Sequence, residues 1–154
     1  MGTRHRGRER AVQVLYEWEL TGRSIDVVLE RFWRAREEPD EVREFAESLA
    51  RGTADRAEHI DSLIDHQAVN WRLDRLSNVD RGILRLGVYE LLNDPDTPAA
   101  VVIDEAIELG KRFSGPGSGQ FVNGILDGIR KRFESDPKSI EMKLEDTTEG
   151  TEES

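Results

Sequence analysis

The sequence predicts an all-α protein, a compact bundle of about six to seven helices in two halves of about three helices each. Apolar residues recur at the three- and four-residue spacing of helices. Glycine, proline, serine and asparagine separate these repeats, and no alternating β pattern competes with them. The chain of 154 residues is long enough for one domain with a sizeable core.

The first half should contain three helices. The first carries an apolar stripe over residues 11–18 and should end near Gly22, because glycine suits the left-handed residue after a helix. Ser24 is placed to cap the second helix. The apolar pattern of the third continues over residues 42–64, which predicts one long helix with a close contact or a bend at Gly52.

The second half should begin with a short helical turn around residues 71–76. A cap at Ser77 or Asn78 should then start a helix that reaches Leu92. Leucine, isoleucine and valine occupy more than one face of this segment, so we expect it to be central and widely buried.

Two further helices should complete the second half. Pro98 is a suitable start for the first of them, since proline is tolerated at the beginning of a helix. The last helix includes the apolar residues of segment 121–133. Gly124 and Gly128 lie about one turn apart in it, where another backbone could approach closely.

Charge divides the chain into three parts. Residues 1–10 carry four arginines in a protein of formal net charge −10. Residues 135–154 carry seven acidic residues and two lysines, and they contain few apolar residues. We therefore expect a basic arm at 1–10, a helical domain at 11–134 and a disordered acidic tail at 135–154.

Composition also bears on the compartment. Cysteine is absent, which excludes disulfides and thiolate metal sites and fits a reducing environment. No apolar run approaches the roughly 20 residues of a membrane span. We expect a cytoplasmic protein without a membrane partner.

Residues suited to catalysis or metal binding are few. His59 and His66 lie seven positions apart on one expected helix, whereas a metal site needs closer spacing and a third ligand. The glycine-rich stretch at residues 114–121 lacks the Gly-Lys-Ser/Thr ending of a nucleotide-binding loop and has no strand before it. We therefore expect no enzyme, no catalytic residue, no metal and no cofactor.

The basic arm is the first candidate for RNA binding, through Arg4, Arg6, Arg8 and Arg10. If the first helix extended back to residue 4, Arg4 and Arg8 would continue its apolar stripe, so the helix should fray around Arg6 to Arg8. The mobile tip would lie outside the packed core. It would order on RNA, where guanidinium groups pair with phosphates and stack on bases. The alternative is a solvated terminus without a function.

The glycine-rich loop is the second candidate. It follows Lys111 and Arg112 and leads into a helix N-terminus, whose free N–H groups attract anions. Ser118, Gln120 and Phe121 are the candidate contacts there, although a plain helix connection with Phe121 in the core is the alternative.

The number of phosphate contacts bounds the RNA affinity of the arm. If the arm neutralises about three or four phosphates, the logarithm of its RNA affinity should fall with the logarithm of the salt concentration with a slope of only about −2 to −3. This modest affinity favours a second RNA-binding subunit on the same strand.

Five sequence blocks occur in order over residues 6–133. They are RERAVQVLYEWEL, W-x-L-x-R-L-x-x-V-D-R-x-I-L-R, VYELL, P-x-x-V-V-I-D-E-A-I-E-L-G-K-R-F and FVNGILD. Together they resemble the NusB family of bacterial transcription factors. The resemblance implies an all-helical NusB-like fold without catalysis.

The resemblance further implies a role in transcription antitermination. It implies binding of single-stranded boxA RNA from ribosomal RNA operons jointly with NusE, a small-subunit ribosomal protein, in a complex with RNA polymerase. Tyr16 and Asp80 are the candidate NusE contacts, and a homodimer of the free protein is possible. Two alternatives stay open: an RNA-targeting domain related to the NusB-like part of rRNA cytosine methyltransferases, and a helical adaptor that binds only proteins.

Overall fold

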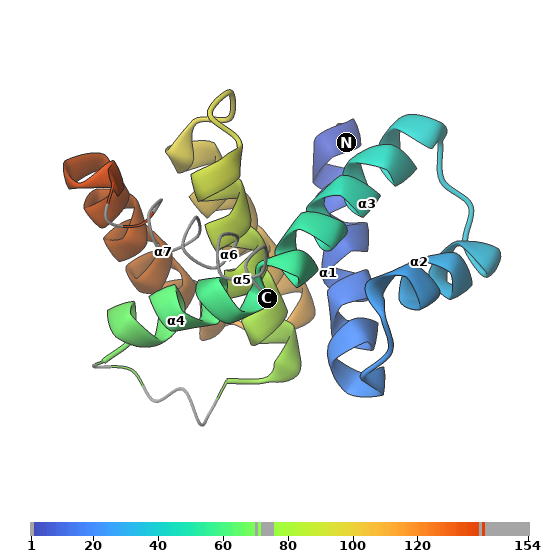
Figure 1. Cartoon of the computed structure of the whole chain (residues 1–154), viewed down its shortest axis with the longest axis horizontal. Helices are drawn as coiled ribbons and strands as arrows, with labels where there is room; N and C mark the ends of the chain where they lie inside the picture. The colour runs from blue at the N-terminus through green and yellow to red at the C-terminus, as the bar shows by residue number, and fades with distance from the viewer. Residues whose placement is uncertain (1, 70, 72–75, 139, 141–154) are drawn as a thin grey trace, which may run out of the picture.

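Seven α-helices account for most of the residues that the computed structural model describes, which are 2–69, 71, 76–138 and 140. They are α1 (Thr3–Thr21), α2 (Ile25–Arg34), α3 (Asp40–Asp55), α4 (Ala57–Gln67), α5 (Asn78–Asn93), α6 (Ala99–Phe113) and α7 (Ser118–Ser135). Helices α1 to α3 lie on one side of the molecule and α4 to α7 on the other (Figure 1). The predicted all-α class and helix number are confirmed.

Local signals set several of the helix ends as expected. Gly22 follows α1 with a positive φ of 68°. The Ser24 hydroxyl caps α2 by accepting a hydrogen bond from the backbone N–H of Val27. At α5, the Ser77 hydroxyl accepts from the Asp80 N–H and the Asp80 carboxylate accepts from the Ser77 N–H, which forms a complete capping box.

The expected single helix over residues 42–64 is wrong. The chain leaves helical geometry at Arg56, where φ is −113° and ψ is 16°, and this residue separates α3 from α4. The break lets α4 pack against α5 and α7 and bury Ile60, Leu63 and Ile64 in the main core. Because the break serves packing against helices that are distant in the sequence, the local apolar pattern is not interrupted there.

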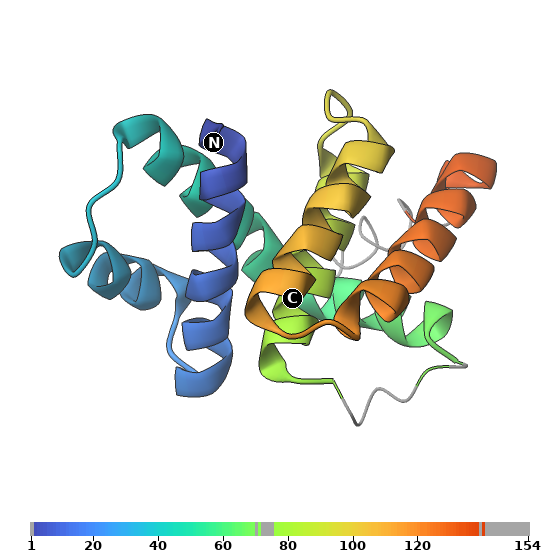
Figure 2. The same cartoon turned by 180° about the vertical axis from the view of Figure 1, so that it is seen from behind.

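One large core and one smaller cluster hold the helices together. The smaller cluster packs residues of α1, α2 and α3: Val14, Val28, Leu29, Phe32, Trp33, Ala46 and Ala50. The large core joins residues from both halves, with Ala11, Val12 and Leu15 of α1 packed among residues of α4 to α7. Helix α1 therefore has buried faces toward both groups, and it lies beside α5 at the junction of the halves (Figure 2).

Glycines permit several close approaches. A Cβ atom at Gly52 would overlap the phenol ring of Tyr89, which confirms a close contact between α3 and α5. Gly124 and Gly128 of α7 also make room, but for the side chains of Trp71 and Gln67 rather than for another backbone. The expected approach of another backbone at Gly124 and Gly128 is therefore wrong.

Two expected segments fall largely on residues that are not described. The turn around residues 71–76 includes 72–75, and the acidic tail includes 139 and 141–154, all of which lie outside the described residues. Within the tail segment, Ile140 is buried and belongs to the large core. Across the described ranges, no helix is both long enough and apolar enough to cross a membrane.

Candidate nucleic-acid interface

The arginines of the expected arm belong to a regular helix. Helix α1 begins at Thr3, so the expected fraying around Arg6 to Arg8 is wrong. The first turns pack against α3, where Phe45 fills the space beside Gly7. The guanidinium groups of Arg4 and Arg8 lie 4.9 and 5.6 Å from the centre of the Phe45 ring, within cation–π range.

Arg8 is buried in an ion pair, contrary to its expected place in a mobile tip. Its Nε and Nη2 donate to the two carboxylate oxygens of Glu90 at 2.8 and 2.9 Å. The side chains of Arg8 and Glu90 are only 4% and 2% exposed. Burial disfavours the charged form of Arg8, but Glu90 outweighs it and raises the pKa of the guanidinium. Glu90 thereby lets an arginine occupy the core face of α1.

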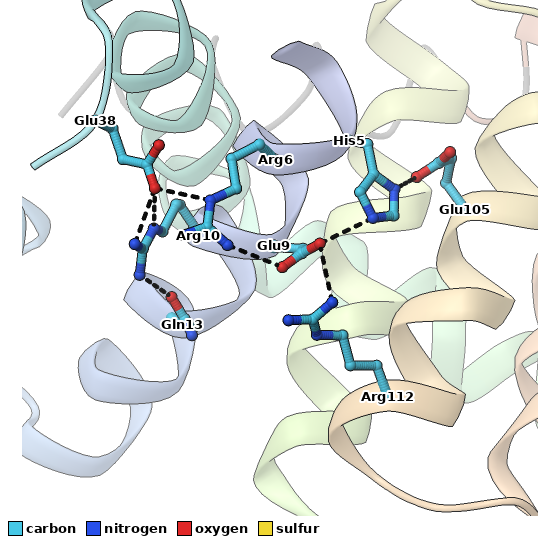
Figure 3. Close-up of polar contacts among 8 residues, drawn as sticks. All are labelled: His5, Arg6, Glu9, Arg10, Gln13, Glu38, Glu105 and Arg112. Atoms are coloured by element: carbon cyan, nitrogen blue, oxygen red, sulfur yellow. Dashed lines mark hydrogen bonds and ion pairs between the residues drawn. The ribbon is translucent and has the colours of Figure 1, made fainter. Parts of the chain in front are cut away.

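Arg6 and Arg10 share one carboxylate, that of Glu38 in the segment between α2 and α3 (Figure 3). Glu38 Oε1 accepts from Arg6 Nε at 2.7 Å and from Arg10 Nε at 2.9 Å. Arg10 Nη1 also donates to Gln13 at 3.0 Å. Burial opposes ionisation of Glu38, but the hydrogen bonds from Arg10 and Arg6 outweigh it and lower the pKa of the carboxyl.

Glu9 is a buried acceptor at the junction of α1 and α6. Its carboxylate lies 2.8 Å from His5 Nε2, 3.3 Å from Arg6 Nη1 and 3.5 Å from Arg112 Nη1 (Figure 3). The other ring nitrogen of His5 lies 2.7 Å from Glu105 on α6. The arrangement places cations of α1 and α6 on either side of one carboxylate.

Four cations of α1 and α6, two of which contact Glu9, keep substantial solvent exposure. The exposed side-chain fractions are 58% for Arg4, 37% for Arg6, 57% for Lys111 and 52% for Arg112. Arg4 contacts Asp94 at 3.5 Å, and Lys111 contacts Glu108 at 3.6 Å. Long surface pairs of this kind are weak, so a phosphate can compete for these cations.

The other candidate contacts near the glycine-rich loop have different exposures. Ser118 begins α7 but is buried beside Gly110, whereas Gln120 is exposed. Phe121 is partly buried and packs edge-to-face with Trp71 at a centroid distance of 6.5 Å. Among the described residues no side chain caps α7; the Ser118 N–H donates to the Gly115 carbonyl at 3.2 Å, and the N–H groups that follow it have no cap. The structure thus leaves Gln120 and the helix end accessible and places Ser118 inside.

The two candidate contacts with NusE, Tyr16 and Asp80, also differ in their solvent exposure. Tyr16 is exposed on α1, as expected of an interface residue. Asp80 is buried, and its carboxylate takes part in the α5 capping box with Ser77. A substitution of Asp80 will therefore change the stability of the helix start as well as the surface charge.

Sequence reasoning missed the acids that organise this surface. Glu9, Glu38, Glu90 and Glu105 received no role there, although they pair with residues of the arm. The pairing of Glu9 with His5 and Arg6 has a local signal, the four- and three-residue spacing on one helix. The other three acids have none.

The described residues offer little for catalysis or metal binding. Within the described part of the chain, no group of three or more His, Asp or Glu side chains is arranged to hold a metal ion. His59 lines an open pocket of about 460 Å³ at the break between α3 and α4. The arginines, exposed amides and helix end instead suit the binding of anions.

Comparison with known families and curated proteins gives a consistent result. The model described as NusB family matches residues 5–131. The transcription antitermination protein NusB of Anaeromyxobacter dehalogenans is 49% identical over 127 residues, covering 82% of this chain and 89% of that protein. The protein of the same name from Myxococcus xanthus is 47% identical over 134 residues, covering 84% and 95%.

Solved structures share the fold. NusB of T. maritima aligns with a TM-score of 0.73 and 40% identity, covering 83% of this chain and 90% of that one. A chain in a structure of the antitermination factors NusB and NusE in complex with dsRNA aligns with a TM-score of 0.74 and 32% identity. That alignment covers 85% of this chain and 98% of the other.

Proposed function

This chain belongs to the NusB family, a family of transcription antitermination factors, and we propose that it binds single-stranded boxA-type RNA of ribosomal RNA operons jointly with NusE. The observation that carries the proposal is the junction of α1 and α6. Exposed cations from both helices gather there around the Glu9 carboxylate. In this role the protein acts within an antitermination complex with RNA polymerase and catalyses no reaction.

The geometry supports a smaller set of RNA contacts than the sequence suggested. Arg4, Arg6, Lys111 and Arg112 have exposed cationic groups, whereas Arg8 is held in a buried pair with Glu90. Because Arg6 and Arg112 flank the same carboxylate, they lie close enough to contact neighbouring phosphates of one strand. Gln120 and the N-terminus of α7 extend the proposed surface with hydrogen-bond donors.

Charge and affinity both support joint binding with NusE. The chain carries a net charge of −10, which complements a basic ribosomal protein and repels RNA outside the cationic junction. Few phosphate contacts give modest affinity, and a second RNA-binding protein on the same strand raises it through effective concentration. A similar protein has been solved together with NusE and dsRNA, which supports the choice of partner.

The double substitution Arg6→Ala/Arg112→Ala tests the RNA surface. It should weaken binding of a labelled boxA-like strand by the complex with NusE about tenfold or more, because two phosphate contacts are lost. Arg34→Ala is the matched control, since Arg34 is an exposed arginine on α2 paired with Glu30. Fluorescence anisotropy with boxA-like and scrambled strands measures both effects. Equal affinity for the two strands, or an equal loss in both variants, would rule out this RNA surface.

The NusE contact is tested with Tyr16→Ala and Asp80→Lys. Both should reduce the affinity of the complex measured by calorimetry. Because Asp80 belongs to the α5 capping box, Ser77→Ala serves as its control: it weakens the same cap without changing the charge. If Ser77→Ala and Asp80→Lys reduce the affinity equally, Asp80 acts through the helix cap and not through NusE.

A further inference from the structure

Glu38 stands out among the acids around the arm because of its position in the chain. It lies in the segment between α2 and α3, four residues past the end of one helix and two before the start of the next. Its side chain is only 7% exposed, since Arg6 and Arg10 cover it from α1. No helical hydrogen-bond ladder holds the backbone at Glu38, in contrast to Glu90 in the middle of α5.

The contacts of Glu38 occupy the parts of the two guanidinium groups that a phosphate would use. A phosphate binds arginine most strongly through two parallel hydrogen bonds, either from Nε and Nη2 or from the two Nη atoms. In Arg10, Nε and Nη2 contact Glu38 and Nη1 donates to Gln13. In Arg6, Nε donates to Glu38 and Nη1 to Glu9. In both arginines Glu38 therefore takes the edge that includes Nε, and Nη1, one of the two nitrogens of the other edge, already has a partner.

From this geometry we propose that Glu38 occupies the place of an RNA phosphate on Arg6 and Arg10, and that RNA must displace it to bind these arginines. The inference rests on the proposed function and adds a residue that sets the affinity of the protein for RNA. One negative charge offsets one of the two positive charges, so the uncomplexed site attracts phosphate less than the arginines alone would. Glu38 therefore lowers RNA affinity and reduces its salt dependence.

The ion pairs of the arginines differ in how readily they can be separated. The Arg8–Glu90 pair is buried between α1 and α5, and separating it would leave a charge without a partner in the core. Displacement of Glu38 needs only a rotation of its side chain or a local shift of the segment at residues 35–39. RNA can therefore reach Arg6 and Arg10 while Arg8 stays paired with Glu90.

Glu38→Gln tests the proposal, with Glu37→Gln as the matched control. Glu37 is exposed in the same segment, and no ion pair or hydrogen bond of its side chain occurs among the described residues, so both variants change the net charge equally. In the complex with NusE, Glu38→Gln should bind a labelled boxA-like strand about 3- to 10-fold more tightly than Glu37→Gln. Its salt slope should be steeper by about 0.7, as for one more neutralised phosphate of a single strand.

Three further tests separate a specific effect of Glu38 from a general effect of charge. The difference between the variants should disappear when Arg6 and Arg10 are both alanine. Calorimetry with tripolyphosphate should show tighter binding to Glu38→Gln than to Glu37→Gln without any RNA or partner. Circular dichroism and thermal melting verify folding, and Glu38→Asp, which shortens the side chain, should shift affinity in the same direction.

The outcomes are distinct. Equal affinities of Glu38→Gln and Glu37→Gln for both probes would overturn the proposal, because only a general charge effect would be present. Weaker binding by Glu38→Gln would also overturn it, because Glu38 would then position the arginines for RNA. If tripolyphosphate binding rises as expected but boxA-like RNA is not preferred over a scrambled strand, the proposal holds and the proposed function fails.

Discussion

Arg8 illustrates at the residue scale how a charged side chain can lie on the core face of a helix. Its Nε and Nη2 are hydrogen-bonded to the Glu90 carboxylate, and the Phe45 ring lies within cation–π range of the guanidinium. The cost of removing the charge from water is offset by this pairing only while both partners are present. A residue of the expected RNA arm is thus part of the folded core.

Arg8→Ala should therefore destabilise the protein rather than act on RNA binding alone. Removal of one partner leaves Glu90 charged and buried, so the free energy of unfolding should fall by about 3–5 kcal/mol. Arg4→Ala is the matched control and should change it by less than about 1 kcal/mol, because the Arg4 pair with Asp94 is largely exposed. Urea denaturation followed by circular dichroism measures both. Equal stabilities would show that the buried pair contributes nothing.

The lowered pKa values of two carboxyl groups, those of Glu38 and Asp94, predict how the stability of the protein responds to acid. Hydrogen bonds from Arg10 and Arg6 lower the pKa of Glu38 against the effect of burial, and a hydrogen bond from Thr97 lowers the pKa of Asp94. A group whose pKa is lower in the folded state stabilises the protein above its unfolded pKa, and this contribution is lost as pH falls through the folded pKa.

Stability should consequently decrease as pH falls below about 4, the ordinary range of carboxyl groups. The double variant Glu38→Gln/Asp94→Asn should show a shallower decrease than the unmodified protein, because it lacks two of the groups that take up protons on unfolding. Urea denaturation at a series of pH values between 7 and 3 measures the decrease. Parallel curves for the two proteins would contradict the assignment.

At the scale of elements, contacts between helices depend on small residues as much as on apolar ones. Gly52 faces Tyr89 where α3 crosses α5, with no space for a methyl group. Gly7 likewise faces Phe45 between α1 and α3. Residues without a side chain at these positions let aromatic rings pack close to the neighbouring backbone.

Gly52→Ala should accordingly destabilise the protein. An alanine in a helix is ordinarily favoured over glycine by about 1 kcal/mol, but the overlap with Tyr89 should reverse the sign and cost about 1–3 kcal/mol. Gly117→Ala is the control, since nothing lies within 4 Å of a Cβ there and its φ is −83°. Combining Gly52→Ala with Tyr89→Ala should remove the penalty. Thermal and urea unfolding measure these stabilities, and a Gly52→Ala variant more stable than the unmodified protein would exclude the steric explanation.

At the scale of the whole molecule, α1 connects packing with the proposed binding. Its apolar residues enter both the small cluster and the large core. Its first half carries the arginines and Glu9, which reach α6 and the segment before α3. The proposed RNA surface, formed by α1, α6 and the start of α7, is thus assembled from three places in the chain that meet only in the folded protein.

The salt dependence of RNA binding tests whether two proteins share one strand. If this chain contributes about three or four phosphate contacts, raising monovalent salt from about 50 to 200 mM should lower its own affinity about 10- to 60-fold. The complex with NusE should bind more tightly and have a steeper slope, because the basic partner adds contacts. Anisotropy titrations at four salt concentrations measure both quantities. Identical slopes with and without NusE would mean that the two proteins do not bind one RNA jointly.

The sequence by itself determined the helical class, most of the helices and several of their ends. Gly22, Ser24 and Ser77 act on backbone groups within a few residues, so their effects are visible in a short stretch of chain. The arginine-rich start and the five family blocks likewise identified the candidate RNA surface without a structure.

Only the tertiary structure decided where α3 ends and which arginines remain accessible. The break at Arg56 serves packing against α5 and α7, and the partners of Arg8 and Arg6 lie 82 and 32 residues away in the sequence. Hydrophobic periodicity records which face of a helix is buried, but not which distant carboxylate will meet a cation on that face. Burial and ion pairing depend on the arrangement of all the helices, and so Arg8 became a core residue while Arg6 stayed at the surface.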